Sequence, residues 1–285
     1  MALYTTDSTE QSVSYYSYSM LYFLLVIYNV KICESPAFIS LKKAYEFFSD
    51  NGGDRDCRFL VIDNSDQPSF CAENKESTRK SGAEYLSMNG NQGLPAAYMR
   101  GIQYALDHGA EWVLISDQDS VFDRQYLQVF FNHLCSGQEK LIYAPEVKEV
   151  KAQKRISPIV RRNRQYYINS GIAVNRKVFA KAGYDKNLFL DYVDYDFFNS
   201  CYALGIGSRI QYIPSMKVSQ NFSGAGKNGL EKDLKRFQIY VRDGRYFYSK
   251  WHKRTWDMEM VIRCLHLCFM YHSFRFLGVL LKNAE

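Results

Sequence analysis

Apolar and polar residues alternate in blocks along the first two thirds of the chain, and these blocks predict strands and helices in turn. The apolar runs at 20–28, 57–63 and 111–116 have the length of strands buried in a parallel sheet. Helical patterns follow near 35–49 and 94–108. This alternation predicts a doubly wound α/β sheet, in which ligands bind at the carboxyl ends of the strands.

The pattern is less regular after the third predicted strand. A helix is expected over 123–135, and the basic stretch 148–165 lacks periodicity, which favours a solvated loop. Extended residues resume over 166–175, and a short helix is expected near Arg176. A loop then leads into a helix that ends at Gly205.

A glycine-rich turn separates this body from the C-terminal part. The turn covers 223–229, and two helical patterns follow it. Its glycines would make it mobile, so that it could order over a bound ligand as a lid. We therefore expect a flexible tail over 1–19, an α/β domain over 20–222, and a lid turn with C-terminal helices over 223–285.

Composition narrows the class of partner. The 285 residues are 47% hydrophobic and 23% charged, which is ordinary for a globular protein. Lys and Arg total 36 against 30 Asp and Glu, an excess that suits anionic ligands or an anionic membrane surface. The excess is too small to indicate nucleic-acid binding.

The cysteines and the apolar runs indicate a reduced, cytoplasmic protein. The seven cysteines are scattered and include no C-x-x-C pair. Cys264 and Cys268 lie near His266 and His272, but their apolar neighbours favour helix packing over a zinc site. The longest apolar run, 20–28, is far shorter than the about 20 residues that a membrane span needs. No Lys or Arg precedes it, as a secretory signal would require.

Acidic residues gather where the predicted strands end. Asp117 and Asp119 leave a strand one residue apart, and two carboxylates so close need a positive partner, for which Mg²⁺ or Mn²⁺ is the first candidate. Asp63 ends another strand. Each of these residues alone is equally explained by a turn or a helix cap. A further acidic cluster is formed by Asp191, Asp194 and Asp196.

Several motifs in one order resemble a known family. They are "FLVIDNS", "NQGLPAAYMRGIQYAL", "LISDQDS", "YINSGIAVNRKVFAKAGYDKNLFLDYVDYDF" and "RFQIYVRDGRYFY", spread over about residues 20–250. Together they resemble the inverting family 2 glycosyltransferases, and in particular the rhamnosyltransferase-like branch with its D-Q-D-S element. The resemblance implies the GT-A fold, a mostly parallel twisted sheet flanked by helices, here with C-terminal helices added.

The resemblance also implies roles for the acidic residues. Asp119 would bind the metal ion directly, and Asp117 would help through water or the ribose. Asp194 would be the general base that takes the proton from the acceptor hydroxyl, and we expect it to be ionised at neutral pH with a pKa near about 4. Asp191 and Asp196 are rivals for that role, or else caps of a helix. The expected donor-nucleotide contacts are Asp63, Asn91, Gly93 and Asp117.

Other residues are candidates for the diphosphate and for the acceptor. Arg242 and Arg245 are three apart and so would share a helix face, and Lys227 lies in the glycine-rich turn. A solvated basic face would explain them equally well. The candidates for the acceptor or sugar pocket are Asn169, Ser170, Gly171 and Asp191, of which the first three could instead form a bulge or turn.

Two positions depart from the family pattern. Met99 stands where an Asn is usual, so one polar contact near the nucleotide is missing. The segment "MKVSQNFSGAGK" lacks the His that completes the metal shell in many members. Gln220, Asn221 or a water would then supply an oxygen in its place.

Other classes match only parts of the sequence. In a haloacid-dehalogenase-type phosphatase Asp117 would be the nucleophile and Asp119 the acid, but two α/β units precede the motif here. A sugar nucleotidyltransferase would need a G-x-G-x-R signature near the first strand, where none is found. A non-catalytic nucleotide-sugar-binding protein of the same fold stays an alternative.

The sequence thus predicts transfer of a sugar from a dTDP- or UDP-sugar donor to a hydroxyl of a growing surface glycan, such as capsule or O-antigen. Rhamnose is the first candidate because of the D-Q-D-S form. A lipid-linked acceptor would bring the apolar and basic stretch 260–283 to the inner face of the plasma membrane. Otherwise that stretch packs in the core.

Overall fold

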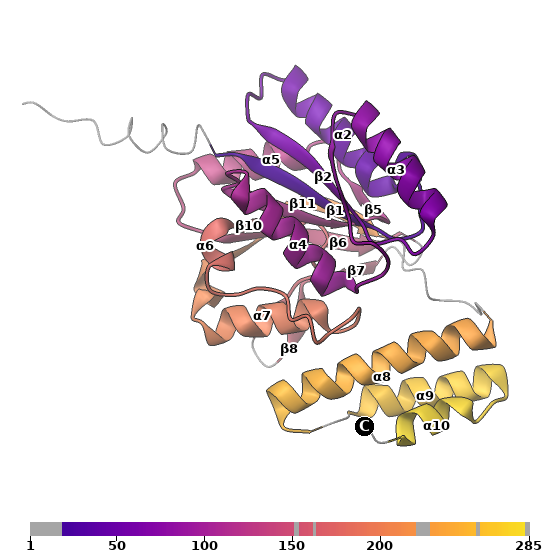
Figure 1. Ribbon diagram of the computed structural model, residues 1–285. Helices are drawn as coiled ribbons and strands as arrows, with labels where there is room; N and C mark the ends of the chain where they lie inside the picture. The colour runs from indigo at the N-terminus through magenta and orange to yellow at the C-terminus, as the bar shows by residue number, and fades with distance from the viewer. Residues whose placement is uncertain (1–18, 151–153, 162–163, 221–228, 255–256, 283–285) are drawn as a thin grey trace, which may run out of the picture.

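The computed structural model describes residues 19–150, 154–161, 164–220, 229–254 and 257–282. Its centre is a nine-stranded mixed sheet in the order β3-β2-β1-β4-β10-β6-β11-β5, with β7 paired to β6 (Figure 1). β1 pairs in parallel with β2 and β4, and β2 with β3, whereas β10 runs antiparallel to β4 and β6. The strands are β1 (Leu21–Ile27), β2 (Cys57–Asp63), β3 (Glu84–Ser87), β4 (Trp112–Asp117), β5 (Ser120–Phe122), β6 (Ile142–Glu149), β7 (Lys154–Ser157), β10 (Ala173–Asn175) and β11 (Ile210–Gln220).

Helices cover both faces of the sheet because side chains of each buried strand alternate between them. On β1, Phe23 packs with α2 (Pro36–Asp50) and α5 (Tyr126–Cys135). Its neighbour Leu24 packs in the opposite cluster, with α4 (Leu94–Asp107) and α7 (Val193–Ala203). Gly101 lets α4 approach closely, since a Cβ there would lie 2.6 Å from Leu24 Cδ1.

The expected strands and helices up to residue 135 are confirmed, with ends shifted by a few residues. Three elements were not expected, α3 (Pro68–Lys80), β3 and β5. The buried residues of α3 are the polar pair Asn74 and Thr78, so its sequence carries no apolar periodicity. Short 3₁₀ turns lie at Ile32–Glu34 and Ile206–Arg209, and α6 covers Arg176–Phe179.

The basic stretch 148–165 is not the loop that its composition predicted. It contains β7 and the small hairpin of β8 (Ile159–Arg161) and β9 (Arg164–Tyr166). Pairing with β6 stabilises β7, although its side chains are mostly exposed. Neighbouring strands therefore decide the conformation here, rather than local apolar pattern.

The C-terminal part holds three helices in the described residues, rather than the two expected. They are α8 (Leu230–His252), α9 (Met258–Tyr271) and α10 (Arg275–Leu281), and they pack together below the sheet and α7 in Figure 1. Phe237, Tyr240 and Phe247 of α8 belong to the same buried cluster as α4 and α7. No helix among the described residues is long and apolar enough to cross a bilayer.

Candidate active site

The chain's Asp117 closes β4 and is held by two hydroxyl groups. The Tyr98 hydroxyl, from α4, donates to Oδ1, and Ser170 Oγ donates to Oδ2 at 2.9 Å. The Asp117 N–H donates in return to Ser170 Oγ at 3.0 Å. Burial raises the pKa of Asp117. The carboxylate is therefore oriented by the fold while its charge lacks a basic partner among these contacts.

Asp119 and Gln220 meet because of the pairing between β5 and β11. Ser120 lies opposite Gln220 in this antiparallel pair, so the residue before Ser120 comes beside the Gln220 side chain. Gln220 Nε2 donates to Asp119 Oδ1 at 3.2 Å. Burial and the neighbouring Asp117 raise the pKa of Asp119 to about 6.

The donor set around Asp119 suits a hard divalent cation. Gln220 Oε1 is buried and has no hydrogen-bond partner within the described residues. An unpartnered amide oxygen beside two carboxylates with raised pKa offers oxygen ligands and a need for positive charge, which fits Mg²⁺ or Mn²⁺. The described residues contain no cluster of three His, Cys, Asp or Glu, so the amide would be part of the shell. Asn221, the other predicted substitute, lies outside the described residues.

Asp194 sits in the first turn of α7 near the same edge of the sheet. Burial and the charge of Asp117 raise its pKa to about 8, against a smaller opposing effect of Asn169. The expectation of a pKa near about 4 is therefore wrong for the metal-free protein. Asn169 Oδ1 accepts from the Tyr184 hydroxyl at 2.9 Å, whereas its Nδ2 has no partner among the described residues.

The two rivals of Asp194 are already paired. Asp191 forms a two-pronged ion pair with Arg236 of α8, with Nη2 to Oδ1 at 2.8 Å. Asp196 is 1% exposed and accepts from Trp251 Nε1 at 2.7 Å, with Lys250 Nζ at 2.8 Å. Asp196 Oδ2 has no partner among the described residues, but Lys250 beside Oδ1 compensates the charge, whereas no such cation is bonded to Asp194, so Asp194 is the better placed of the three.

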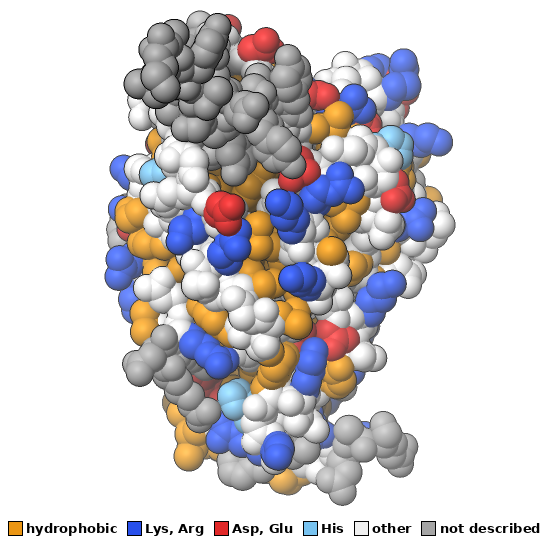
Figure 2. Space-filling model, turned by 90° about the vertical axis from the view of Figure 1, so that its left-hand side faces the viewer, with side chains coloured by type: hydrophobic (Ala, Val, Ile, Leu, Met, Phe, Trp, Pro, Cys, Tyr) orange, Lys and Arg blue, Asp and Glu red, His pale blue; other side chains and the backbone are white. Residues whose placement is uncertain are grey.

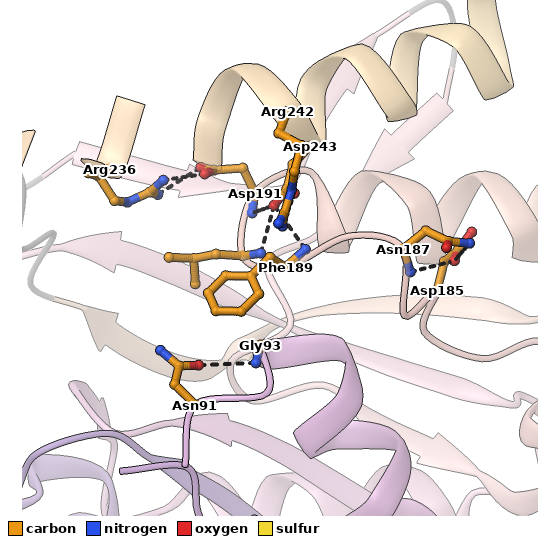
Figure 3. A network of polar contacts seen from close by, with 10 residues as sticks. Asn91, Gly93, Asp185, Asn187, Phe189, Asp191, Arg236, Arg242 and Asp243 are labelled. Carbon is orange, nitrogen blue, oxygen red and sulfur yellow. Dashed lines mark hydrogen bonds and ion pairs between the residues drawn. The ribbon is translucent and has the colours of Figure 1, made fainter. Parts of the chain in front are cut away.

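A buried carboxylate of α8 holds the loop that leads into α7. Asp243 is fully buried, and its Oδ2 accepts the N–H groups of Phe189, Leu190 and Asp191 at 3.0, 2.7 and 2.9 Å (Figure 3). Arg242 donates to the other oxygen, with Nη2 to Oδ1 at 2.8 Å. The C-terminal helices are thus bonded to the segment that carries Asp194.

Gly93 brings the start of α4 against the same loop (Figure 3). It has φ +84°, and a Cβ there would lie 2.9 Å from the Phe189 carbonyl oxygen. The Gly93 N–H donates to Asn91 Oδ1 at 3.0 Å, and Asn64 Nδ2 donates to the same oxygen at 3.0 Å. Asn91 and Gly93 therefore shape the turn at the strand ends, as only a glycine fits this close approach.

Asp63 lies at the expected strand end but faces inward. It is fully buried and accepts from Ser65 N at 3.0 Å, Asn74 Nδ2 at 3.1 Å and the Tyr85 hydroxyl at 3.0 Å. These bonds fix the loop after β2 against α3 and β3. A direct contact between Asp63 and a nucleobase stays a prediction, and this enclosed network argues against it.

The basic candidates fall in different places. Arg242 lies over the Phe189 ring, 5.3 Å from its centroid, close to the site. Arg245 instead donates to the Leu280 carbonyl at 2.7 Å and to that of Lys282, so it caps the end of α10. A contact between Arg245 and the diphosphate stays a prediction, and these bonds to the end of α10 argue against it. Lys227 and the glycines before 229 lie outside the described residues.

The segment 169–171 forms a buried turn beneath Asp117. A turn was the alternative to the acceptor or sugar pocket in the sequence analysis. Gly171 has φ +86°, and its N–H donates to the Ile115 carbonyl at 2.7 Å. Asn169 and Ser170 are both fully buried. Ser170 holds Asp117, and Asn169 lies close enough to Asp194 to offset part of the rise that burial causes in its pKa, so the two residues leave little surface for an acceptor.

Sequence comparison decides the family. The sequence model described as "Glycosyl transferase family 2" matches residues 40–186, just over half of the chain. This chain is a family 2 glycosyltransferase. A curated relative, the dTDP-rhamnosyl transferase RfbF of Shigella flexneri, is 25% identical over 217 residues, which cover 70% of this chain and 68% of the relative.

Solved structures of other glycosyltransferases have the same fold as this chain. The mannosyltransferase PcManGT of Pyrobaculum calidifontis, in complex with GDP-Man and Mn²⁺, matches with a TM-score of 0.52 and 16% identity over 93% of this chain and 73% of its own. Glucosyl-3-phosphoglycerate synthase from Mycobacterium tuberculosis, in complex with Mn²⁺, UDP and glucosyl-3-phosphoglycerate, gives 0.51 and 11%, covering 85% of each chain. The predicted GT-A fold is confirmed, and the phosphatase alternative is wrong, since the matching family and fold are those of glycosyltransferases and the D-Q-D element begins only at the end of the fourth strand.

Sequence reasoning missed three residues that build the glycosyltransferase site. Tyr98 donates to Asp117, and Tyr184 donates to Asn169. Asp243 accepts the backbone N–H groups of residues 189–191. Asp243 carried one signal, since an acid flanked by Arg242 and Gly244 on the inner face of a helix must find donors there. Met99 receives the Tyr184 N–H at its Sδ, 3.2 Å away, and so packs on the aromatic layer under Asp194.

Proposed function

We propose that the chain is an inverting, divalent-metal-dependent glycosyltransferase that moves a sugar from a nucleoside-diphosphate donor to a hydroxyl group. One observation carries the proposal. Three carboxylates, Asp117, Asp119 and Asp194, share one edge of the sheet, and burial raises the pKa of each. Uncompensated acids of this kind gather at catalytic sites that receive a positive charge from a ligand.

Asp119 and Gln220 Oε1, with Asp117 behind them, would hold Mg²⁺ or Mn²⁺. The bound cation supplies charge neutralisation for the departing diphosphate. Asp117 is fixed by Tyr98 and Ser170, so its orientation costs no rearrangement when the donor binds. Arg242, whose side chain is 56% exposed and lies over the Phe189 ring, is the described cation that we propose contacts the phosphates.

Asp194 would act as the general base. The acceptor oxygen forms a bond to the anomeric carbon, the bond from that carbon to the diphosphate oxygen breaks, and the hydroxyl proton passes to Asp194. A single displacement of this kind inverts the anomeric configuration. A base with a pKa near the working pH both accepts the proton readily and exists partly ionised. The raised pKa of Asp194 therefore suits this role.

The donor is proposed to be a dTDP- or UDP-sugar, with dTDP-rhamnose first. The support is the D-Q-D-S element together with the curated relative named a dTDP-rhamnosyl transferase. The acceptor is proposed to be a growing surface glycan, including a lipid-linked one. Asp191 is paired to Arg236, so the acceptor would reach Asp194 past this ion pair without displacing it.

The test incubates the purified chain with dTDP-rhamnose or UDP-sugars, Mn²⁺ and candidate acceptor glycans. We expect nucleoside diphosphate to appear only with acceptor and metal, and NMR of the product to show an inverted anomeric centre. Release of inorganic phosphate, a retained configuration, or an unchanged rate after chelation would contradict the proposal.

A further inference from the structure

The outer face of α9 carries an apolar stripe that no described part of the chain covers. Met258, Ile262, Leu265 and Phe269 are 65%, 60%, 58% and 78% exposed. Their spacing of four, three and four residues places them along one side of the helix. The helix is anchored from its other side, where Met260, Cys264 and Leu267 are buried against α8 and α10.

The stripe continues beyond the helix. Phe274, in the turn after α9, is 83% exposed, and Leu281 at the end of α10 is 70% exposed. Large apolar side chains scattered singly on a surface are ordinary, but four along one side of a helix, with two more on the turn after it and on α10, are a concentration of the kind that marks interaction sites.

Basic residues outnumber acidic ones in the segment that carries this stripe, although Arg275 is ion-paired with Glu231 and Arg263 lies over the Tyr240 ring, 4.3 Å from its centroid. The basic residues between 253 and 282 are Lys253, Arg254, Arg263, Arg275 and Lys282, and the acidic ones are Asp257 and Glu259. Asp257 is buried and caps α9, so its charge is directed inward. The basic excess is not confined to these helices, since Lys and Arg side chains also outnumber Asp and Glu on the side of the molecule that Figure 2 shows.

This combination selects among the possible occupants. A second copy of the chain would bring two basic rims together, and like charges repel across an apolar contact. An anionic lipid surface accepts both features, because apolar side chains enter the acyl boundary and Lys and Arg meet the headgroups. The described helices cannot span a bilayer, so the contact would lie in the plane of the interface.

We propose that α9, with Phe274 and Leu281, is a docking face for an anionic membrane surface. The sequence alone suggested that the whole stretch 260–283 contacts the membrane. Cys264, Leu267 and Phe276 of this stretch are buried, so the proposed contact is limited to the outer face of α9 with Phe274 and Leu281. The docking stands apart from the proposed chemistry, since no residue of the stripe belongs to the site described above.

The test is flotation of the purified full chain with phosphatidylcholine vesicles, with and without phosphatidylglycerol. We expect binding to the anionic vesicles that weakens as salt screens the basic rim. The double variant Ile262→Gln, Phe269→Gln should lower the partition coefficient about tenfold or more, because two side chains no longer enter the interface. Arg263→Gln should lower it several-fold.

Val160→Gln is the matched control, since Val160 is 65% exposed and lies on β8, outside the C-terminal helices. It should bind vesicles as the wild type does, and thermal unfolding should show every variant folded. Absence of binding to anionic vesicles, wild-type binding by the double variant, or equal binding to neutral vesicles would overturn the proposal. So would a dimer, detected by light scattering, that the double variant dissociates. Each readout is independent of glycosyl transfer, so it can fail while the proposed function holds.

Discussion

The carboxylate of Asp243 accepts the backbone N–H of Asp191 at 2.9 Å, and so joins the last third of the chain to the loop that positions the proposed base. A charged acceptor with three amide donors is one of the stronger polar arrangements that a buried site offers. The C-terminal helices therefore help to hold the loop that leads to Asp194 in place.

Replacing Asp243 should lower the stability of the folded chain. Asp243→Asn removes the charge that three amides and Arg242 share, so we expect the free energy of unfolding to fall by about 2–4 kcal/mol. Denaturant unfolding followed by circular dichroism measures this. Arg242→Gln is the control, because its half-exposed pair with Asp243 should be worth less than about 1 kcal/mol. If both variants lowered the free energy of unfolding equally, the three amide hydrogen bonds to Asp243 would not be what stabilises the loop.

The role of Asp194 is tested by removing its charge alone. Asp194→Asn should lower kcat by about 100-fold or more and leave donor affinity intact, because the side chain keeps its size but cannot take a proton. Steady-state kinetics and calorimetric titration with the nucleotide give the two quantities. Asp191→Asn, which loses only the pairing to Arg236, should have the smaller effect on kcat. Full turnover in Asp194→Asn would move the base to another residue.

Metal binding should depend on Asp119 and Gln220 together. Mn²⁺ should raise the melting temperature of the wild type, because it binds the folded state alone. This rise should vanish in Asp119→Asn and shrink in Gln220→Ala, which lacks the unpartnered amide oxygen. Ser200→Ala, which removes only a bond from the Ser200 hydroxyl to the Asp196 carbonyl within α7, is a suitable control for general effects. An unchanged rise in both site variants would place the metal elsewhere.

The stability of the metal-free chain should fall as pH rises from about 4 to about 8. The pKa of Asp119 is raised to about 6 and that of Asp194 to about 8, above the unfolded values near 4. The folded state therefore binds more protons than the unfolded state in this window, and deprotonation disfavours folding. Mn²⁺ should stabilise the chain more at the upper end of the window than at the lower. Thermal melts across pH, with and without Mn²⁺, would show it, and a pH-independent metal effect would contradict it.

Asp63 gives a prediction that separates its two proposed roles. Asp63→Ala strips the acceptor from Ser65, Asn74 and Tyr85, and we expect a loss of about 2–4 kcal/mol in the free energy of unfolding. Tyr85→Phe, which removes one donor, should cost about 1 kcal/mol. Full stability with weaker nucleotide binding in Asp63→Ala would instead support the base contact expected from the family resemblance.

Sequence reasoning was most successful where chemistry follows from strand ends. The position of Asp117 and Asp119 at one edge of the sheet could be predicted, because the carboxyl ends of strands converge there. The absence of the usual His left Gln220, Asn221 and a water as candidates, and the sequence could not choose among them. The pKa of Asp194 could not be predicted, since its burial beside Tyr98 and Tyr184 arises only after α4 and α7 pack. Arg242 and Arg245 were predicted from their spacing alone to share one helix face. In the structure Arg242 bonds to Asp243, whereas Arg245 bonds to the end of α10.

The hydrogen-bond register of β5 with β11 has a consequence for the length of the chain. Gln220 reaches Asp119 only because it lies opposite Ser120 at the end of an eleven-residue strand. Side chains alternate along a strand, so inserting a single residue late in β11 would turn the amide to the opposite side of the sheet. Natural variants of this enzyme should therefore tolerate substitutions along β11 far better than a deletion or insertion of one residue.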